Sequence, residues 1–319
     1  MKRVAIFASF NRDGVIAPFV VYFLKELNKE VENIVFIADN EVLPREEEKI
    51  KDVVVYSRCE RHGCYDFGSY RRGFEWAEEN GLLKDADELI FCNDSCYGPI
   101  YPFEGVFTEM EKRDCDFWGM TESYQISHHI QSYFMVFRKK VFSSETFKAF
   151  VSSFEKKENF WGYVENYETK FTDYLCEAGF KCSQLCPYES ITNHDEKEFV
   201  NPCVFPVTLL SLGIPLVKRK VFVNKHGGFL AESQKTLMNI IKSQNPVLYN
   251  IIRDDSYELL LDANDYKVQY ETKLEECKEI IEYLSYKRKK HLYAIRLLIY
   301  SLSIVVVVLI VVLFLMFKK

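Results

Sequence analysis

The first part of the chain alternates short apolar runs with segments of helical period, and turn residues separate them. Continuous apolar runs are typical of strands that are covered on both faces. The predicted strands are residues 4–7, 33–38, 53–56, 88–92, 117–120 and 133–137, and the predicted helices are residues 18–27, 70–79, 103–111, 144–154 and 164–178. This alternation predicts an α/β domain with a mainly parallel sheet and helices on both faces.

The pattern changes after about Gly228, where strand signals stop and helical periodicity follows, interrupted at Pro246. Over residues 258–286, apolar residues recur at gaps of three, four or seven, which is typical of a helix pair or a short coiled coil. Packing on the chain's own domain and formation of a homodimer both fit this pattern. We therefore expect a globular domain over residues 1–228 and a helical stalk over residues 229–290.

The segment 297–317 contains nothing more polar than two serines and a tyrosine. A helix of about 20 such residues spans the roughly 30 Å hydrocarbon core of a bilayer. Its backbone hydrogen bonds are all internal, so lipid leaves none unsatisfied. The sequence therefore predicts one transmembrane helix, at residues 294–317.

Basic residues flank the predicted span, with Lys-Arg-Lys-Lys at 287–290 before it and Lys318 and Lys319 after it. Positive charge is retained on the cytoplasmic side of membranes, and it attracts anionic lipid headgroups. We therefore expect a single-pass protein of the cell membrane whose globular domain lies in the cytoplasm.

Composition narrows the classes of function. The net charge is -6, and acidic and basic residues are mixed along the chain, so no basic stripe indicates nucleic-acid binding. The ten cysteines contain no CxxC pair, which favours buried free thiols. A metal cluster of Cys182, Cys186 and His194 is an alternative that the spacing leaves open.

Asp66 and Gly68 open a polar, basic stretch that continues through Arg71 and Arg72 to Gly73, at the start of a predicted helix. The amino end of a helix presents free N–H groups to a phosphate. The two arginines would add charge-assisted hydrogen bonds to a diphosphate. Glycine-flanked helix starts are common, so this signal is weak by itself.

The polar residues Asn93, Asp94 and Ser95 follow the predicted strand 88–92. In parallel sheets, ligands bind beyond the carboxyl ends of the strands. Asp94 would hold a divalent cation there, and the cation would neutralise a leaving diphosphate. The alternative is that Asp94 and Ser95 only satisfy the backbone of a turn.

Glu168 lies early in the predicted helix 164–178 and is a candidate general base. The alternative is an ordinary first-turn glutamate, which the helix dipole favours. Trp118, Tyr124 and Tyr133 are candidates for an apolar platform under a sugar, although isolated aromatic residues more often belong to a core.

The chain resembles the rhamnan synthesis F family, because five stretches occur in the order found there: DFGSYRRG, ELIFCNDSCYGPIYPFE, DCDFWGMTES, HIQSYFMVFRKKVFSSETF and NYETKFTDYLCEAGF. The resemblance covers roughly residues 4–223. These are bacterial glycosyltransferases of cell-wall and lipopolysaccharide assembly, and the family is similar to GT-A enzymes. The resemblance therefore implies a GT-A-like fold for this chain.

The resemblance also assigns roles. Asn93, Asp94 and Ser95 take the place of the donor- and metal-binding Asp-x-Asp, although only one acid remains for Mg²⁺ or Mn²⁺. Glu168 takes the position of the base. By the same resemblance, the donor side is lined by Asp66, Gly68, Arg71 and Arg72, and the acceptor or sugar side by Trp118, Glu122, Gln131 and Tyr133.

The expected function is therefore transfer of a sugar, with rhamnose from a donor such as dTDP-rhamnose favoured, to a growing lipid-linked glycan at the membrane. A GT-A enzyme for another nucleotide hexose keeps the fold and changes the donor. A catalytically inert membrane scaffold of a polysaccharide assembly complex is the alternative from another class.

Overall fold

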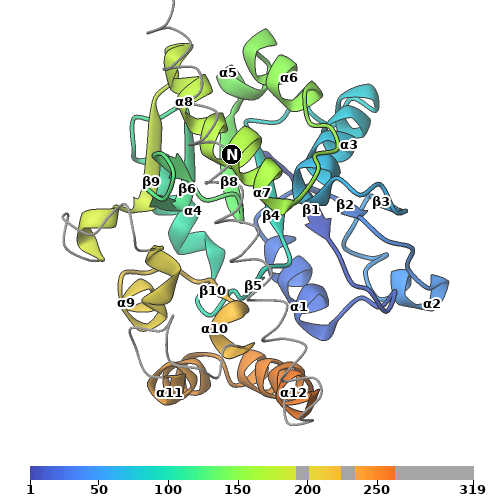
Figure 1. Ribbon diagram of the computed structural model, residues 1–319, viewed down its shortest axis with the longest axis vertical. Helices are drawn as coiled ribbons and strands as arrows, with labels where there is room; N and C mark the ends of the chain where they lie inside the picture. The colour runs from blue at the N-terminus through green and yellow to red at the C-terminus, as the bar shows by residue number, and fades with distance from the viewer. Residues whose placement is uncertain (192–200, 224–233, 263–319) are drawn as a thin grey trace, which may run out of the picture. The chain divides into compact units, whose positions relative to one another are not determined.

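The computed structural model describes residues 1–191, 201–223 and 234–262 (Figure 1). The chain divides into two compact units, Met1–Glu258 and Leu259–Lys319. Almost all of the described residues belong to the first unit, and the following paragraphs concern that unit.

An eight-stranded mixed sheet forms the centre of the first unit, in the order β3-β2-β1-β4-β8-β6-β7, with β9 paired to β6. Strands β1 to β4 are mutually parallel, whereas β8 runs antiparallel to both β4 and β6. The strands are β1 (Arg3–Ser9), β2 (Asn33–Ala38), β3 (Tyr56–Cys59), β4 (Glu88–Asn93), β6 (Phe117–Ser123), β7 (His129–Ile130), β8 (Phe134–Arg138) and β9 (Cys182–Cys186). A separate antiparallel pair joins β5 (Cys96–Tyr97) to β10 (Val217–Lys218).

The expected α/β class with a largely parallel sheet is confirmed, and the differences concern short or half-buried strands. The predicted strand 53–56 is displaced, because pairing with β2 starts only at Tyr56. Strand β9 was not predicted, since most of its residues are only half-buried and form no apolar run.

The helices alternate with the strands in the first part of the unit (Figure 1). They are α1 (Pro18–Leu27), α2 (Pro44–Glu47), α3 (Tyr65–Glu79), α4 (Phe103–Glu111), α5 (Lys139–Phe142), α6 (Glu145–Ser152), α7 (Phe160–Tyr163), the π-helical turn η1 (Val164–Glu168), α8 (Thr169–Glu177), α9 (Pro206–Ser211), α10 (Lys220–Val223), α11 (Gln234–Gln244) and α12 (Pro246–Asp262).

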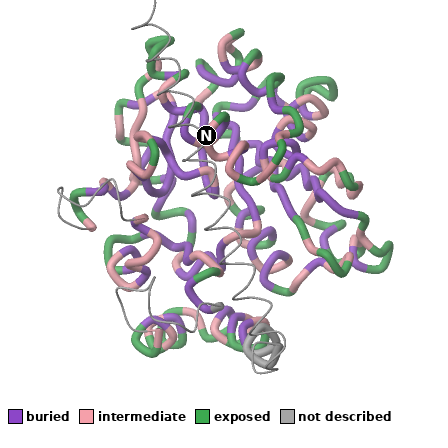
Figure 2. The backbone as a smooth tube through the Cα atoms, in the orientation of Figure 1, coloured by how far each residue is buried: buried purple, intermediate pink, exposed green. Residues whose placement is uncertain are grey.

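Helices cover both faces of the sheet, as expected, and produce two apolar cores. The alternation of side chains along β1 divides them: Ala5 and Phe7 pack with α1 and α4, whereas Val4 and Ile6 pack with α3, α6 and α8. The buried stretches of backbone in Figure 2 follow the central strands. Each large apolar side chain that is buried contributes about 1.5–3 kcal/mol.

The first unit extends beyond residue 228, where the helical stalk was expected to begin. Helices α11 and α12 bury Leu237, Ile241, Leu248 and Ile252 in the core that contains α1. The predicted boundary is therefore too early, because these helices pack onto the domain instead of leaving it.

Most of the predicted stalk, most of the segment 258–286 and the whole predicted span 294–317 lie outside the described residues. Within residues 1–191, 201–223 and 234–262, no helix is long and apolar enough to cross a bilayer. The stalk, the homodimer and the membrane span stay predictions.

Candidate active site

Polar residues gather where the parallel strands β1 and β4 end. The Asp94 carboxylate accepts hydrogen bonds at Oδ2 from the Ser9 hydroxyl at 2.7 Å and from the backbone N–H of Phe10 at 2.8 Å. Two neighbouring strands therefore fix Asp94 at the carboxyl edge of the sheet, which is where ligands bind in such folds.

Asn93 links this edge to the first turn of α3. Its Nδ2 donates to Oδ2 of Asp66 at 2.8 Å, and its Oδ1 accepts from the Ser95 backbone N–H at 3.1 Å and from the Ser95 hydroxyl. Because Asn93 is buried at the end of β4, it holds the turn and the helix in one arrangement.

Glu168 reaches the same region from the end of the π-helical turn η1. Its Oε1 accepts from the Ser132 backbone N–H at 3.0 Å and from the Ser132 hydroxyl at 2.7 Å. The Tyr70 hydroxyl of α3 donates to the Ser132 carbonyl at 3.0 Å. The segments 66–73, 93–99 and 167–169 are thus brought together, and Asp66, Asp94 and Glu168 share one acidic cluster.

Two cations, Lys218 and Arg219, complete the cluster. Neither was predicted to be a site residue from the sequence. Pairing of β10 with β5 brings them in: Lys218 donates from Nζ to the Ser95 hydroxyl at 2.9 Å, and the Arg219 N–H donates to the Ser95 carbonyl at 3.0 Å. The available signal was the stretch GIPLVKRKVF, in which a short apolar run ends in consecutive basic residues.

The charges of the cluster shift one another's pKa values. Burial raises the pKa of Asp66 to about 7, and the carboxylates of Asp94 and Glu168 add to this effect. The ammonium of Lys218 opposes it. Burial also raises the pKa of Asp94, while its hydrogen bonds from Phe10 and Ser9 act in the opposite direction.

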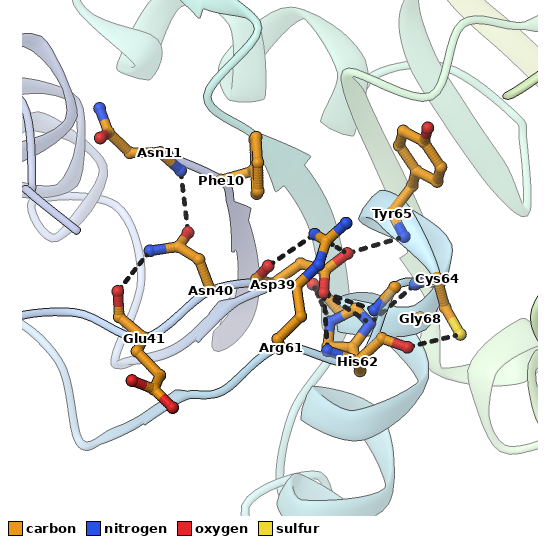
Figure 3. Close-up of polar contacts among 12 residues, drawn as sticks. Phe10, Asn11, Asp39, Asn40, Glu41, Arg61, His62, Cys64, Tyr65 and Gly68 are labelled. Carbon is orange, nitrogen blue, oxygen red and sulfur yellow. Dashed lines mark hydrogen bonds and ion pairs between the residues drawn. The ribbon is translucent and has the colours of Figure 1, made fainter. Parts of the chain in front are cut away.

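The amino end of α3 is occupied by an anion of the chain itself, as Figure 3 shows. The Asp39 carboxylate, which follows β2, accepts from the backbone N–H groups of His62 and Gly63 at 2.7 Å each and of Tyr65 at 3.2 Å. The helix begins at Tyr65, so residues 66–73 lie inside it. Asp39 thus takes one N–H of the helix, that of Tyr65, together with two of the loop before it. The expected phosphate-binding turn is a helical segment in the structure, and its role in binding a donor stays a prediction.

Arg71 and Arg72 do not contact the acidic cluster. Arg71 pairs with Glu75 at 2.7 Å, and Arg72 donates to the Gly68 carbonyl at 3.1 Å. Both line a separate hollow of about 440 Å³ together with Arg58, Cys64, Glu75, Phe154, Glu155 and Lys156. The reason is helical geometry: at about 100° per residue, positions 71 and 72 point away from the face that carries Asp66 and Tyr70.

Gly68 has a packing role in this arrangement. A Cβ atom at this position would lie 2.3 Å from Cβ of Cys64 and 2.9 Å from Nδ1 of His62. The glycine therefore lets the first turn of α3 approach the loop that follows β3.

Gly68→Ala is expected to destabilise the protein by about 1–3 kcal/mol, since overpacking forces a backbone shift. Gly105→Ala in α4 is the matched control, because nothing lies within 4 Å of the added methyl group there. Urea unfolding of both variants measures the difference. Equal stabilities would contradict the packing role of Gly68.

The candidates on the predicted acceptor side are mostly structural. Trp118 is fully buried and packs against Phe107 and Phe134, so it cannot support a sugar, and that expectation is corrected. Tyr133 is buried as well, but its ring lies 4.4 Å from the Lys218 ammonium and so borders the cluster.

Glu122, expected on the acceptor or sugar side, is buried in β6. Its carboxylate accepts from Nε2 of His128 at 2.6 Å, from Nε2 of Gln184 at 3.0 Å and from the Tyr188 N–H at 2.9 Å. These bonds connect β6 to the segments beside it.

Gln131, also buried, accepts from the Thr121 hydroxyl at 2.7 Å and donates to Asn201 at 3.2 Å. Its amide is thus bonded at both ends to neighbouring segments of the chain.

The acids of the cluster suit a cation that arrives with a phosphate. Over the described ranges, no group of three or more His, Cys, Asp or Glu side chains is placed to hold a metal ion. Mg²⁺, however, is commonly bound by one or two carboxylates together with substrate phosphates, and Asp94 and Asp66 supply such carboxylates. The alternative cluster of Cys182, Cys186 and His194 remains untested, because His194 lies outside the described residues.

An exposed aromatic ring lies beside the cluster, at the end of β1. Phe10 is 49% exposed, and the Arg61 guanidinium lies 5.2 Å from its ring centroid (Figure 3). Asn40, after β2, accepts a hydrogen bond from the Asn11 N–H at 2.8 Å and holds this loop. These residues were not predicted from the sequence.

Two curated relatives match part of the chain. The virulence protein VirA of Vibrio anguillarum is 26% identical over 190 residues, which cover 58% of this chain and 60% of VirA. The protein y4gN of Sinorhizobium fredii is 24% identical over 206 residues, which cover 59% of this chain and 49% of y4gN. The chain thus spans about half of y4gN and 60% of VirA.

Among solved structures, the mannosyltransferase Ktr4p from S. cerevisiae in complex with GDP is 10% identical, with a TM-score of 0.32 over 47% of this chain and 60% of that one. The family model described as rhamnan synthesis protein F matches residues 34–305, which is most of the chain. This protein therefore belongs to the rhamnan synthesis protein F family.

Proposed function

We propose that this protein is a membrane-anchored GT-A glycosyltransferase that transfers a sugar from a nucleoside diphosphate donor to a lipid-linked glycan. Rhamnose, from a donor such as dTDP-rhamnose, is the favoured sugar, in keeping with the family. The observation that carries the proposal is the meeting of Asp66, Asp94, Glu168 and Lys218 at the carboxyl ends of β1 and β4.

The proposed reaction is a single displacement at the anomeric carbon of the donor sugar. The acceptor oxygen forms a bond to that carbon while the bond from the carbon to the diphosphate oxygen breaks. The electron pair of the broken bond leaves with the diphosphate, and Glu168 takes the proton of the acceptor hydroxyl. Positive groups near the diphosphate stabilise the charge that develops there.

The position of Glu168 suits the role of the base. Both hydrogen bonds from Ser132 end on Oε1, so they hold the carboxylate in one orientation. Among the described residues, Oε2 has no hydrogen-bond partner, so it is the oxygen that would receive the acceptor's proton. Ser132 is in turn fixed through its carbonyl by Tyr70.

The donor would extend along the carboxyl edge of the sheet. Its nucleoside would lie over the exposed Phe10 ring, and its diphosphate would face Asp94 and Lys218. A divalent cation held by Asp94 would, when bound, neutralise part of the diphosphate charge. The bonds from Ser9 and Phe10 keep the Asp94 carboxylate facing this edge.

The acceptor and the location follow from the predicted span. If residues 294–317 cross the cytoplasmic membrane, the site and a polyprenyl-linked glycan are confined to the same surface. Tethering then raises the effective concentration of the acceptor without any new contact. A homodimer through residues 258–286 is compatible with this arrangement.

The proposal is tested by thermal unfolding of the full-length chain with a panel of nucleotide sugars. A true donor at 100 times its Kd stabilises the protein by about 2.7 kcal/mol. We expect dTDP-rhamnose to give the largest stabilisation and slow hydrolysis. Stabilisation by a different nucleotide hexose would change the assigned donor and leave the proposed reaction unchanged. No effect from any nucleotide sugar on the folded protein would instead support the inert scaffold.

A further inference from the structure

We propose that Lys218 is a built-in cation that binds the donor diphosphate directly, so that diphosphate binding does not depend on a divalent metal ion. This inference rests on the proposed function and adds a binding residue to the same site. It concerns a side chain far from the acidic motifs in sequence, which β10 delivers to the end of β4.

The Lys218 ammonium is held in place by two contacts. Its Nζ donates to the Ser95 hydroxyl at 2.9 Å and lies 4.4 Å from the Tyr133 ring centroid. An ammonium has three N–H donors, and the bond to Ser95 is its single hydrogen bond to the described residues. Two donors are therefore free to bind an anion next to Asp94.

The surroundings keep this side chain charged. Burial by itself would lower the pKa of Lys218, but the charges of neighbouring groups, the Glu168 and Asp66 carboxylates among them, outweigh burial, and the pKa is raised. A positive group is needed at this place, because the acidic cluster alone would repel a diphosphate. Lysine is a common binder of phosphate and acts there as a point charge.

Arg219, the next residue in the chain, adds a second positive charge that acts on Asp94. Its Nε is fully buried and has no hydrogen-bond partner in the described part of the chain. Its guanidinium is nevertheless held, 4.3 Å from the Phe19 ring centroid and 3.4 Å from Asp255. A buried donor without a partner lowers stability unless an ion or a water completes it.

The composition of the motif after β4 agrees with this division of roles. Asn93 stands in place of the first acid of the expected Asp-x-Asp, and its Nδ2 donates a hydrogen bond to Asp66. The site therefore carries fewer ligands for a resident cation, and Lys218 supplies positive charge of its own.

The test is calorimetric titration of the full-length chain with dTDP in the presence of EDTA. We expect wild type to bind and Lys218→Met to bind about 10- to 100-fold more weakly, because a hydrogen bond to a charged group is lost. Lys218→Arg keeps the charge and is expected to retain most of the affinity. Lys220→Met is the matched control, since Lys220 is exposed two positions further on and its loss should change nothing.

The outcomes separate the two proposals. If dTDP binds only with Mg²⁺ or Mn²⁺ and Lys218→Met binds as wild type does, the inference is overturned while the proposed function stands. If dTDP, dTDP-rhamnose and the other nucleotide sugars bind under neither condition, the proposed function fails, and the inference fails with it. Should Lys218→Met not fold, Lys218→Gln provides the same readout, because it keeps a polar group that can bond to Ser95.

Discussion

Glu168→Gln is expected to lower sugar transfer by about a hundredfold to ten-thousandfold while donor binding stays close to that of wild type. Glutamine keeps the shape of the side chain and can still accept the two hydrogen bonds from Ser132. It cannot take a proton from the acceptor hydroxyl at neutral pH. The loss should therefore appear in the chemical step, measured as single-turnover transfer to a lipid-linked acceptor.

Glu177→Gln is the matched control for this experiment. Glu177 is exposed at the end of α8, the helix that follows Glu168 directly, so its replacement should leave transfer unchanged. Unchanged turnover in Glu168→Gln would remove the residue from the base role. Loss of donor binding together with turnover would make Glu168 a binding residue instead.

Asp66→Asn is expected to stabilise the protein at pH 8 by about 2–4 kcal/mol while it weakens activity. The pKa of Asp66 is raised to about 7 by burial and by the neighbouring carboxylates. Above that pH, the folded protein therefore holds the negative charge of Asp66 in a buried, acidic environment, which lowers its stability. Asparagine removes the charge and can still accept the hydrogen bond from Asn93.

The sign of the pH dependence follows from the raised pKa. In the unfolded chain Asp66 titrates near 3.8, and in the folded protein near 7. Its contribution to stability is fully present below about pH 4 and is lost as the pH rises through 7. The gap between Asp66→Asn and wild type should thus widen from pH 5 to pH 8 and then level off.

Urea unfolding at pH 5 and pH 8 measures this gap, with Asp85→Asn as the control. Asp85 is exposed, so its replacement should change stability by no more than about 0.5 kcal/mol at either pH. If Asp66→Asn were no more stable than wild type at pH 8, this would contradict the raised pKa of Asp66 in the acidic cluster. A gain in stability with a loss of activity is typical of residues kept for function.

Local pattern alone was enough for much of the fold. The helices at Pro18–Leu27 and Phe103–Glu111 and the strand at Asn33–Ala38 have the bounds that periodicity predicts. The polar residues at the end of β4 were singled out because a short apolar run locates a strand end, where ligands bind. Glu168 was singled out from its place early in a predicted helix.

The direction of individual side chains was not accessible in this way. Arg71 and Arg72 look like diphosphate ligands in the sequence, but α3 starts several residues earlier than its apolar period indicates, and the helix turns them away from the acids. The early start is set by Asp39, a residue after β2 that caps the helix from a distance.

The sequence by itself determined the α/β class, because buried strands and helices leave local patterns, and the family, because several stretches match it. It proposed the acids at 66, 94 and 168 as a site. The tertiary structure decided which cations face those acids. Lys218 lies 123 positions from Ser95, and only the pairing of β10 with β5 brings them into contact. A pairing over that distance depends on the packing of the whole domain, so no local pattern can report it.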